Sequence, residues 1–455
     1  MCGIVGVLGN HEVAPILVEA LKRLEYRGYD SAGIATLNDG HLERRRAVGK
    51  LVNLSDLLVH EPLAGKAGIG HTRWATHGAP TVGNAHPHKY GSVAVVHNGI
   101  IENFRELRAE MAEAGVDFVT DTDTETVAML AQLHMDRGDD PVAAAKHAVG
   151  RLTGSFALAF LFDGHDDLIV AARSGSPLAV GYGTGEMYVG SDAIALSPMT
   201  DRICYLEDGD IAVVTRSSVE ITDARGQLAN RPIKTIQIES TLIDKAGHKH
   251  FMAKEIAEQP GMIQNTLNHY LSDTGEIMLP GAGLDFARVE RITMVACGTA
   301  YLACFVAKYW FEKIARLPVE VDVASEYRYR EPPVTPNTLA FFVSQSGETA
   351  DTLAALRYSA GKAATIASVV NVPESSIARE SDLALPIHAG VEVGVASTKA
   401  FTCQLTVLYL LVLKAARDRG TLTDAELATH VADLRGLPGI VNVALDQNDA
   451  MRDDA

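Results

Sequence analysis

Cysteine is scarce in this sequence of 455 residues. The five cysteines, an odd number that contains no CxxC pair, exclude a disulfide framework and indicate a reducing compartment. A signal segment is also lacking, because residues 1–10 are apolar but have no basic stretch and are too short. We therefore expect a cytoplasmic protein. The cysteines are Cys2, Cys204, Cys297, Cys304 and Cys403.

Basic residues are also fewer than acidic ones, and long apolar runs are lacking. The 40 lysines and arginines face 57 aspartates and glutamates, which gives a formal net charge of −17. Such a balance argues against a nucleic acid or an anionic membrane as a partner, because both need basic patches. The longest apolar run, around Phe401–Ala416, is interrupted by polar residues and is shorter than the ~20 apolar residues of a membrane span. It predicts a buried helix.

The length predicts two or more domains. Residues 1–217 contain short apolar runs, such as Ser92–His97 and Phe156–Phe162, with helical stretches between them. This order is typical of layered sheets that are covered by helices. Residues 218–284 are polar and contain several prolines, so we expect a connector. Within it, His250–Pro260 predicts a helix that ends at its proline.

Residues 285–425 have a different order of predicted elements, in which strand, loop and helix alternate. Ile292–Ala296 and Leu339–Val343 are predicted strands, and each is followed by a polar loop and a helix. This repetition predicts an α/β domain with a parallel, doubly wound sheet. Ligands of such sheets bind beyond the carboxyl ends of the strands. We therefore expect the loops around Thr299, Ser346 and Ser397 to lie at one edge.

Cys2 is the most informative residue of the first half. Once Met1 is removed, Cys2 carries a thiol and a free α-amine within a few ångströms of each other. The amine titrates near ~8 and the thiol near ~8.5, so both exchange protons at neutral pH. Such a pair is suited to nucleophilic acyl transfer, with the amine as the general base. The alternative is a small residue that happens to follow Met1.

Three further sites in the first half suit the same chemistry. Arg73 can hold a substrate carboxylate with two hydrogen bonds, although a surface salt bridge is the alternative. Asn98 and Gly99 offer an amide and a backbone N–H for an oxyanion hole, and a tight Asn-Gly turn is the alternative. The segment 121–125 (DTDTE) can place a carboxylate near a substrate ammonium, and the alternative is a helix cap; one of its aspartates can cap while the other binds.

Five histidines lie close together in the first half, which raises the question of a metal. No HExxH motif and no cysteine–histidine pairing accompanies them, so we expect no metal. These residues are His71, His77, His86, His88 and His97.

Several motifs together give the first half a resemblance to a known family. It resembles the class II glutamine amidotransferases, which are N-terminal-nucleophile hydrolases with an αββα sandwich. The motif sequences are most similar to those of the glutamine–fructose-6-phosphate aminotransferases (isomerizing), and the resemblance extends over nearly the whole chain. The motifs are MCGIVG, LEYRGYDSAG (24–33), HTRWATHG (71–78), NAHPH (84–88), VVHNGIIEN (95–103), TDTE (122–125), HKHFMAKEIAEQP (248–260), ACGTA (296–300), ASEYRYR (324–330), LAFFVSQSGETADTL (339–353), NVPESS (371–376), RESDLAL (379–385) and VGVASTKAFTCQL (393–405).

The resemblance implies a role for each polar residue of the first half. Cys2 attacks the side-chain amide of glutamine with its own amine as the base, and Asn98 and Gly99 stabilise the oxyanion. Arg73 holds the α-carboxylate, and Asp123 holds the α-amino group. The remaining residues with an implied role are Thr76 and His77, which belong to the same glutamine-binding loop, and Trp74, which gates the movement of ammonia.

The second half resembles a sugar isomerase (SIS) domain. Hydroxyls, an amide and the N–H groups at a helix N-terminus hold an anion without a lysine, although ordinary helix capping is the alternative. The implied phosphate loop consists of Ser344, Gln345, Ser346 and Thr349, and Thr299, Val395 and Ser397 match positions that contact the sugar. Ala300 stands where relatives commonly carry serine, which removes one hydroxyl.

For the whole chain the resemblance implies transfer of the amide nitrogen of L-glutamine to fructose 6-phosphate, which gives glucosamine 6-phosphate and L-glutamate. It implies a homodimer and no cofactor. The family has a second isomerase subdomain, to which residues 426–455 look like the lead-in. A glutaminase that binds sugar phosphate without converting it is therefore the alternative function, and a non-enzymatic sugar-phosphate sensor is a third possibility. Amidophosphoribosyltransferase and asparagine synthetase activities are weaker alternatives, because the loops they need are absent from the sequence.

Overall fold

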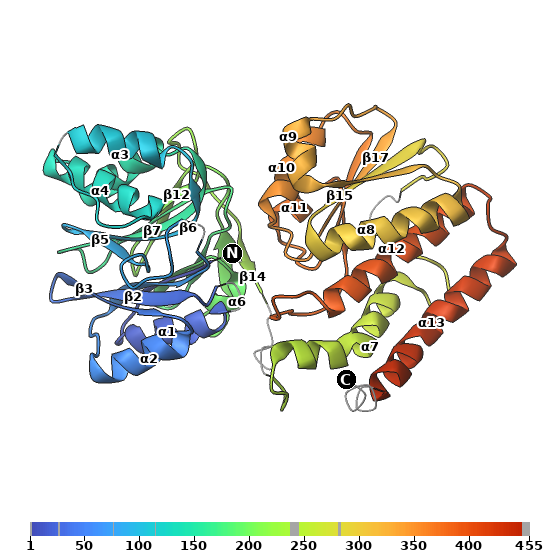
Figure 1. Ribbon diagram of the computed structural model, residues 1–455, viewed down its shortest axis with the longest axis horizontal. Coiled ribbons are helices and arrows are strands. Elements are labelled where there is room, and N and C mark those ends of the chain that lie inside the picture. The colour runs from blue at the N-terminus through green and yellow to red at the C-terminus, as the bar shows by residue number, and fades with distance from the viewer. Residues whose placement is uncertain are drawn as a thin grey trace. The chain divides into compact units, whose positions relative to one another are not determined.

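The computed structural model describes residues 2–25, 28–75, 77–113, 115–236, 245–280 and 284–447. The chain divides into two compact units, Met1–Thr241 and Leu242–Ala455 (Figure 1).

Two antiparallel sheets form the centre of the first unit. The first sheet consists, in spatial order, of β14 (Ile233–Thr235), β11 (Arg202–Tyr205), β9 (Ala179–Tyr182), β10 (Met187–Gly190), β1 (Gly3–Leu8), β4 (Ala67–Arg73), β2 (Ser31–Asn38) and β3 (His41–Val48). The second sheet consists of β13 (Val219–Thr222), β12 (Ile211–Val214), β8 (Ile169–Ser174), β7 (Gly154–Phe162), β6 (Val93–Ile101) and β5 (His88–Tyr90).

Helices cover the outer face of each sheet (Figure 1). The first sheet packs on α1 (Ala14–Lys22), α2 (Leu51–His60) and α6 (Ala193–Leu196). The second sheet packs on α3 (Phe104–Glu113), α4 (Asp123–Asp136) and α5 (Pro141–Gly150). The predicted αββα sandwich is therefore confirmed.

Strand β7 shows why the apolar runs of this half carry no polar alternation. Successive side chains of a strand point to opposite faces. Ala157, Ala159 and Leu161 pack between the two sheets, whereas Leu158 and Phe160 pack beneath the helices. Both faces of the strand are buried, so both faces are apolar.

The second unit is built on a parallel sheet of five strands. Its spatial order is β16 (Val319–Val323), β15 (Arg291–Ala296), β17 (Thr338–Ser344), β18 (Thr365–Val370) and β19 (Leu383–Pro386). One face packs on α7 (Phe251–Tyr270), α8 (Gly298–Trp310), the π-helical turn η3 (Phe311–Ala315), α12 (Lys399–Asp418) and α13 (Asp424–Asp446). The other face packs on α9 (Ala324–Arg330), α10 (Ala350–Ser359) and α11 (Ser376–Arg379). Helices on both faces confirm the predicted doubly wound α/β domain (Figure 1).

The segment expected as a connector, 218–284, is folded over much of its described length. Strands β13 and β14 extend the two sheets of the first unit, and α7 packs on α12 and α13 in the second unit. Of the expected lead-in 426–455, the described residues 426–447 belong almost entirely to α13, which begins with a capping box between Thr423 and Glu426.

The prediction that the helix around 250–260 ends at Pro260 is wrong, because α7 continues to Tyr270. Proline lacks the N–H that would bond to the carbonyl oxygen four residues earlier. Here the side-chain amide of Gln259 donates to that oxygen, which belongs to Ile256, at 3.0 Å. Burial of Ile263 and Leu267 then favours continuation of the helix beyond the proline.

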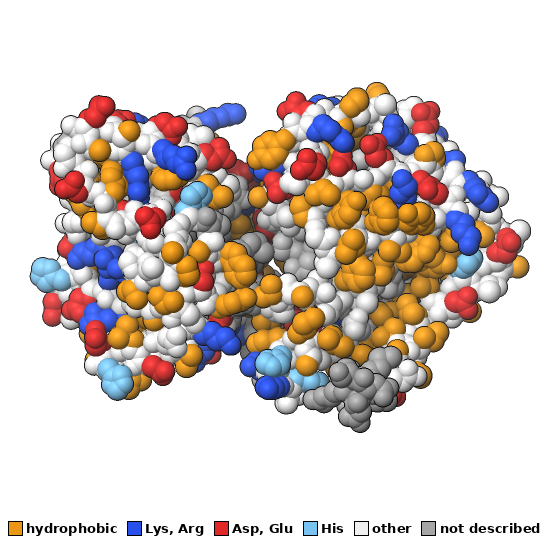
Figure 2. All heavy atoms as spheres, in the orientation of Figure 1, with side chains coloured by type: hydrophobic (Ala, Val, Ile, Leu, Met, Phe, Trp, Pro, Cys, Tyr) orange, Lys and Arg blue, Asp and Glu red, His pale blue; other side chains and the backbone are white. Residues whose placement is uncertain are grey.

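The predicted buried helix around Phe401–Ala416 is α12. It is the one described helix that is long and apolar enough to cross a membrane, but 72% of its most apolar window is buried inside the protein. It is therefore a core helix of the second unit. The exposed apolar side chains of this unit gather instead over α8, where Leu302, Phe305 and Tyr309 are 51%, 41% and 56% exposed (Figure 2).

Candidate active site

A small cleft in the first unit brings together six residues predicted from the sequence. Strand β1 pairs with β4, so Cys2, which precedes β1, lies beside the end of β4. Gly99 comes from β6, and Asp123 is the first residue of α4. The six residues are Cys2, Arg73, Trp74, His77, Gly99 and Asp123.

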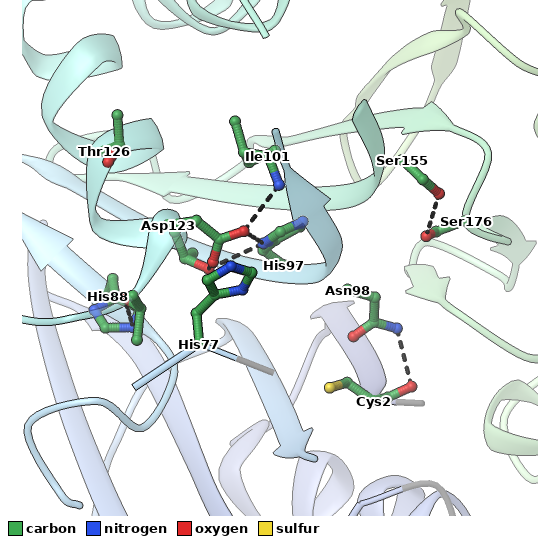
Figure 3. A network of polar contacts seen from close by, with 12 residues as sticks. Cys2, His77, His88, His97, Asn98, Ile101, Asp123, Thr126, Ser155 and Ser176 are labelled. Atoms are coloured by element: carbon green, nitrogen blue, oxygen red, sulfur yellow. Dashed lines mark hydrogen bonds and ion pairs between the residues drawn. The ribbon is translucent and has the colours of Figure 1, made fainter. Parts of the chain in front are cut away.

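The Cys2 thiol lies against the backbone at the end of β4. Its Sγ accepts a hydrogen bond from the Trp74 N–H at 3.2 Å, and the Cys2 carbonyl oxygen accepts one from the Asn98 amide at 3.0 Å (Figure 3). Burial raises the pKa of the Cys2 thiol above its usual range, and the Trp74 N–H and the Arg73 charge oppose part of that rise. The thiol is therefore protonated at neutral pH and needs a base before it can attack.

Asn98 and Gly99 lie inside β6 and not in a hairpin turn. Gly99 pairs with Phe156 of β7 and has a φ of +124°. A Cβ at this position would lie 1.9 Å from the Ser155 carbonyl oxygen, so no other residue fits without moving the strands. The close approach explains the glycine beside the asparagine.

Arg73 is 3% exposed, so it is not a surface residue. Its guanidinium donates to the carbonyl oxygens of His77, Gly78 (3.2 Å) and Ala79 (3.4 Å). Within the part of the chain that the structure describes, no ion pair of Arg73 is found. A buried cation that is held only by backbone carbonyls suits an anionic ligand.

Asp123 is 4% exposed and does not cap its own helix. Its carboxylate accepts the Ile101 N–H at 2.9 Å and lies 3.8 Å from the Nδ1 of His97 (Figure 3). The carboxylate is thus fixed against the end of β6, on the wall of the same cleft.

The loop after β4 carries the other predicted residues of this half. The Trp74 ring, which is 42% exposed, packs edge-on against Tyr29 at 5.4 Å. The His77 ring packs edge-on against Phe104 at 5.5 Å. Thr76 lies outside the described residues.

Four of the five neighbouring histidines form one buried cluster, a packing role that the sequence did not indicate, and two of them, His86 and His97, line the cleft. His71 and His86 stack at 4.1 Å, His97 lies 3.0 Å from Thr124 Oγ1, and His88 lies 3.0 Å from Thr122 Oγ1. Burial lowers the pKa of all four imidazoles, and that of His71 falls to about 3. The four neutral rings link the end of β4 to β6 and to the start of α4.

A different group among the described residues has the spacing of metal ligands. His134, Asp139 and His147 place their ligand atoms within 4.8 Å of one another at the turn between α4 and α5. Asp139 Oδ2 lies 3.2 Å from His134 Nδ1 and 2.6 Å from His147 Nδ1. Two hydrogen bonds between the imidazoles and the carboxylate therefore also account for this arrangement. It lies outside the cleft around Cys2.

In the second unit, the predicted sugar-phosphate residues follow the carboxyl ends of three parallel strands. Ser344 is the last residue of β17, and Gln345, Ser346 and Thr349 lie between it and α10. Thr299 lies in the first turn of α8, after β15. Val395 and Ser397 lie between β19 and α12. Parallel pairing of β15, β17, β18 and β19 places these loops at one edge of the sheet.

The loop 345–349 is closed by its own hydroxyl groups. Ser344 Oγ accepts the Gly347 N–H at 3.0 Å, and Ser346 Oγ accepts the Glu348 N–H at 3.2 Å. Gly347 has a φ of +65°, and a Cβ there would lie 1.9 Å from Ser375 Oγ. Because the Ser346 hydroxyl accepts a backbone N–H, it keeps its own hydrogen for an anion.

Two buried glutamates that the sequence did not single out hold the loop before α12. Glu392 accepts the Ser397 hydroxyl at 3.0 Å and the N–H groups of Thr398 and Ala400 at 2.9 and 3.0 Å. Glu255 of α7 accepts the Gly394 N–H at 3.0 Å. Glu392 therefore caps α12 from six residues upstream of its N-cap, a contact that no local motif indicates.

Comparison with known proteins supports the domain predicted for each half of the chain. A family profile described as "Glutamine amidotransferase domain" matches residues 79–198, and one described as "SIS domain" matches residues 285–414. The "Glutamine--fructose-6-phosphate aminotransferase [isomerizing]" of Brucella abortus biovar 1 (strain 9-941) is 57% identical over 450 residues, which are 99% of this chain and 74% of that protein. The protein of the same name from Bradyrhizobium diazoefficiens is 58% identical over 447 residues, which are 98% of this chain and 74% of that protein.

A solved structure is also similar. The "C-terminal domain of glucosamine-fructose-6-phosphate aminotransferase from Francisella tularensis" is 44% identical, with a TM-score of 0.44, and covers 46% of this chain and 59% of that chain.

The fold and the two matching family profiles define a class II glutamine amidotransferase domain joined to a SIS domain. More narrowly, the chain belongs to the family of glutamine–fructose-6-phosphate aminotransferases (isomerizing). It spans about three quarters of the length of the curated relatives named here.

Proposed function

We propose that this protein transfers the amide nitrogen of L-glutamine to fructose 6-phosphate, giving glucosamine 6-phosphate and L-glutamate. The observation that carries the proposal is the cleft around Cys2. A thiol, a buried cation and a buried carboxylate line one small cavity there, in a chain that is 57% identical to a relative named for this reaction. The reaction needs no cofactor.

The proposed glutaminase step begins at Cys2, after removal of Met1. Sγ forms a bond to the side-chain amide carbon of glutamine, and the thiol proton passes to the α-amine of Cys2. The charge that develops on the amide oxygen is stabilised by the Asn98 side-chain N–H and the Gly99 backbone N–H. When the C–N bond breaks, the amine returns the proton to the leaving nitrogen as ammonia departs. Water then hydrolyses the thioester to L-glutamate.

Arg73 and Asp123 are proposed to hold the two charged groups of the substrate. Arg73 binds the α-carboxylate of glutamine, and Asp123 binds its α-ammonium. Their low exposure supports these roles, because a buried charge is stabilised by an opposite charge. We assign Thr76 and His77 to the same glutamine-binding loop, and Trp74 to control of the path by which ammonia leaves the cleft.

The sugar phosphate is proposed to bind at the carboxyl edge of the parallel sheet. Ser344, Gln345, Ser346 and Thr349 hold the phosphate at the N-terminus of α10, where hydroxyl and N–H donors converge on an anion. The remaining assigned residues contact the sugar; they are Thr299, Val395 and Ser397. Ala300, which is 7% exposed, offers no hydroxyl there.

We also propose that the protein is a cytoplasmic homodimer. Free cysteines support a reducing compartment. The exposed apolar side chains over α8 support association, because patches of this kind mark interfaces (Figure 2). Sedimentation velocity measures the oligomeric state directly.

Replacing Ser346 by alanine is expected to weaken fructose 6-phosphate binding by about tenfold, the typical loss of one hydrogen bond to a charged group. Titration calorimetry with the full chain measures this affinity. Ser381→Ala is the matched control, because Ser381 precedes β19 at the opposite edge of the sheet and bonds to the Ile377 carbonyl. Equal affinities for the wild type and Ser346→Ala would contradict the phosphate loop.

A single incubation with L-glutamine and fructose 6-phosphate tests the function, if glutamate and glucosamine 6-phosphate are followed separately. Equal amounts of both products are the expected result. Glutamate without the amino sugar would restrict the function to a glutaminase that binds sugar phosphate. Absence of both products would overturn the proposal.

A further inference from the structure

His71 lies directly behind the proposed oxyanion hole. Its Nε2 is 2.9 Å from the His97 carbonyl oxygen and 3.0 Å from Asn98 Oδ1. A carbonyl oxygen only accepts, so Nε2 carries the proton and donates to both oxygens. The other ring nitrogen, Nδ1, is buried and has no hydrogen-bond partner among the described residues, which agrees with the same tautomer.

The same reasoning fixes the orientation of the Asn98 amide. Its nitrogen lies 3.0 Å from the Cys2 carbonyl oxygen, which also only accepts, and its oxygen faces the His71 N–H. The two contacts lie at opposite ends of the amide and agree with each other. One N–H of the amide is engaged by Cys2, so the second N–H remains for a ligand oxygen.

The surroundings of His71 keep its ring neutral. The side chain is fully buried and stacks on His86 at 4.1 Å, and both its burial and the nearby charge of Arg73 oppose a positive charge on it. The other charged group near the cluster, Asp123, contacts His97. A neutral ring donates one N–H and exchanges no proton with the substrate, so its effect passes through the asparagine.

We infer that His71 is a positioning residue for the proposed glutaminase step, because its Nε2–H holds the Asn98 amide in the one orientation that offers an N–H to the oxyanion. This inference rests on the proposed function. Without the His71 donor, nothing in the described chain favours that orientation except the single bond to the Cys2 carbonyl. The amide would then present its oxygen to the developing negative charge in a share of the molecules.

A double-mutant cycle tests the inference. His71→Phe keeps an aromatic ring to stack on His86 but has no N–H. We expect it to lower the kcat of glutamate release by about 10- to 100-fold with little change in KM, since removal of one oxyanion donor costs ~100- to 1000-fold. Asn98→Ala should cost at least as much, and the double variant should be no slower than Asn98→Ala alone. The inference would be overturned if the loss of kcat in the double variant equalled the product of the losses in the two single variants, or if kcat were unchanged in His71→Phe.

Two further readouts separate positioning from structural damage. The Cys2 thiol adds to the carbonyl carbon of the aldehyde analogue of glutamine. The product is a hemithioacetal whose tetrahedral carbon carries the oxygen that the Asn98 N–H binds, so the affinity of the analogue should fall in His71→Phe by the same factor as kcat. The rate at which iodoacetamide alkylates Cys2 should stay unchanged. His88→Phe is the control, because it removes a histidine of the same cluster whose Nε2 contacts the Thr122 hydroxyl and not Asn98. An equal loss of analogue affinity in His88→Phe would count against the inference.

His71→Gln restores an N–H donor and should recover part of the lost kcat. If His71→Phe does not fold, nitrogen NMR of the wild-type imidazoles decides the matter. A neutral His71 ring protonated at Nε2 from pH 5 to pH 9 is expected, and an Nδ1–H tautomer overturns the inference. A wild-type protein that releases no glutamate would instead contradict the proposed function, whatever the state of His71.

Discussion

Replacement of Cys2 by alanine is expected to reduce glutamate release from L-glutamine by at least ~10⁴-fold, the scale seen when a catalytic nucleophile is lost. No other cysteine lines the cleft of the first unit, since Cys204 is buried elsewhere in that unit and the rest belong to the second unit. The measurement is a coupled glutamate assay on the purified full chain. Fructose 6-phosphate affinity is the internal control, and it should be unchanged. Residual glutamate release at the wild-type rate would refute the assignment of the nucleophile.

The same experiment depends on removal of Met1. While Met1 is attached, the nitrogen of Cys2 belongs to a peptide bond and has no basic lone pair. Because burial raises the pKa of the Cys2 thiol, little thiolate is present at neutral pH to act without a base. Chains that keep Met1, identified by mass spectrometry, are therefore expected to be inactive. Activity in proportion to the processed fraction is the expected result.

The sequence was sufficient to predict the layers of both units. Apolar runs such as that of β7 indicate strands buried on two faces, and strand–loop–helix repetition indicates a parallel sheet whose loops share one edge. Pro260 shows the limit of a local rule. Proline ends a helix in isolation, but the Gln259 side chain and the buried face beyond it outweigh that preference in α7.

The residues of the cleft could be named from their motifs, but their supporting contacts could not. His71 and Asn98 are 27 positions apart, and Glu255 and Gly394 are 139 positions apart. Hydrogen bonds over such separations depend on strand register and helix packing, which no short pattern encodes. From the sequence, five neighbouring histidines only raised the question of a metal site, whereas in the structure four of them are buried beside hydroxyl, carbonyl and backbone N–H partners.

That histidine cluster leads to a second expectation, which concerns acid. In the unfolded chain each histidine binds a proton near pH ~6.5, whereas burial lowers the pKa of His71, His86, His88 and His97 in the folded protein. The unfolded state therefore binds more protons below pH ~6.5, and the free energy of unfolding must fall as the pH falls through that value. For His71 the loss continues until about pH 3.

The size of this effect is comparable to the stability of a domain. For His71 alone, a shift in pKa from ~6.5 to about 3 changes the free energy of unfolding by on the order of 5 kcal/mol. The total free energy of unfolding of a domain is ~5–15 kcal/mol. The first unit is thus expected to unfold in mild acid, before pH ~4. In the described part of the second unit, His388 is the one histidine whose pKa burial lowers, so that unit should lose less stability.

The two tryptophans, Trp74 and Trp310, allow the two units to be followed separately. Trp310→Phe leaves Trp74 as the probe of the first unit, and Trp74→Phe leaves Trp310 as the probe of the second unit. Urea titrations between pH 7 and pH 5 should show a steeper fall in the free energy of unfolding for the first unit than for the second, with a slope of about 1.4 kcal/mol per pH unit for each proton taken up. His88→Phe removes one such titrating group and should reduce that slope by at most about 1.4 kcal/mol per pH unit, a limit reached toward pH 5. A constant free energy of unfolding for the first unit over this range would mean that the buried histidines already bind protons in the folded protein, and it would remove the basis for treating His71 as a neutral donor.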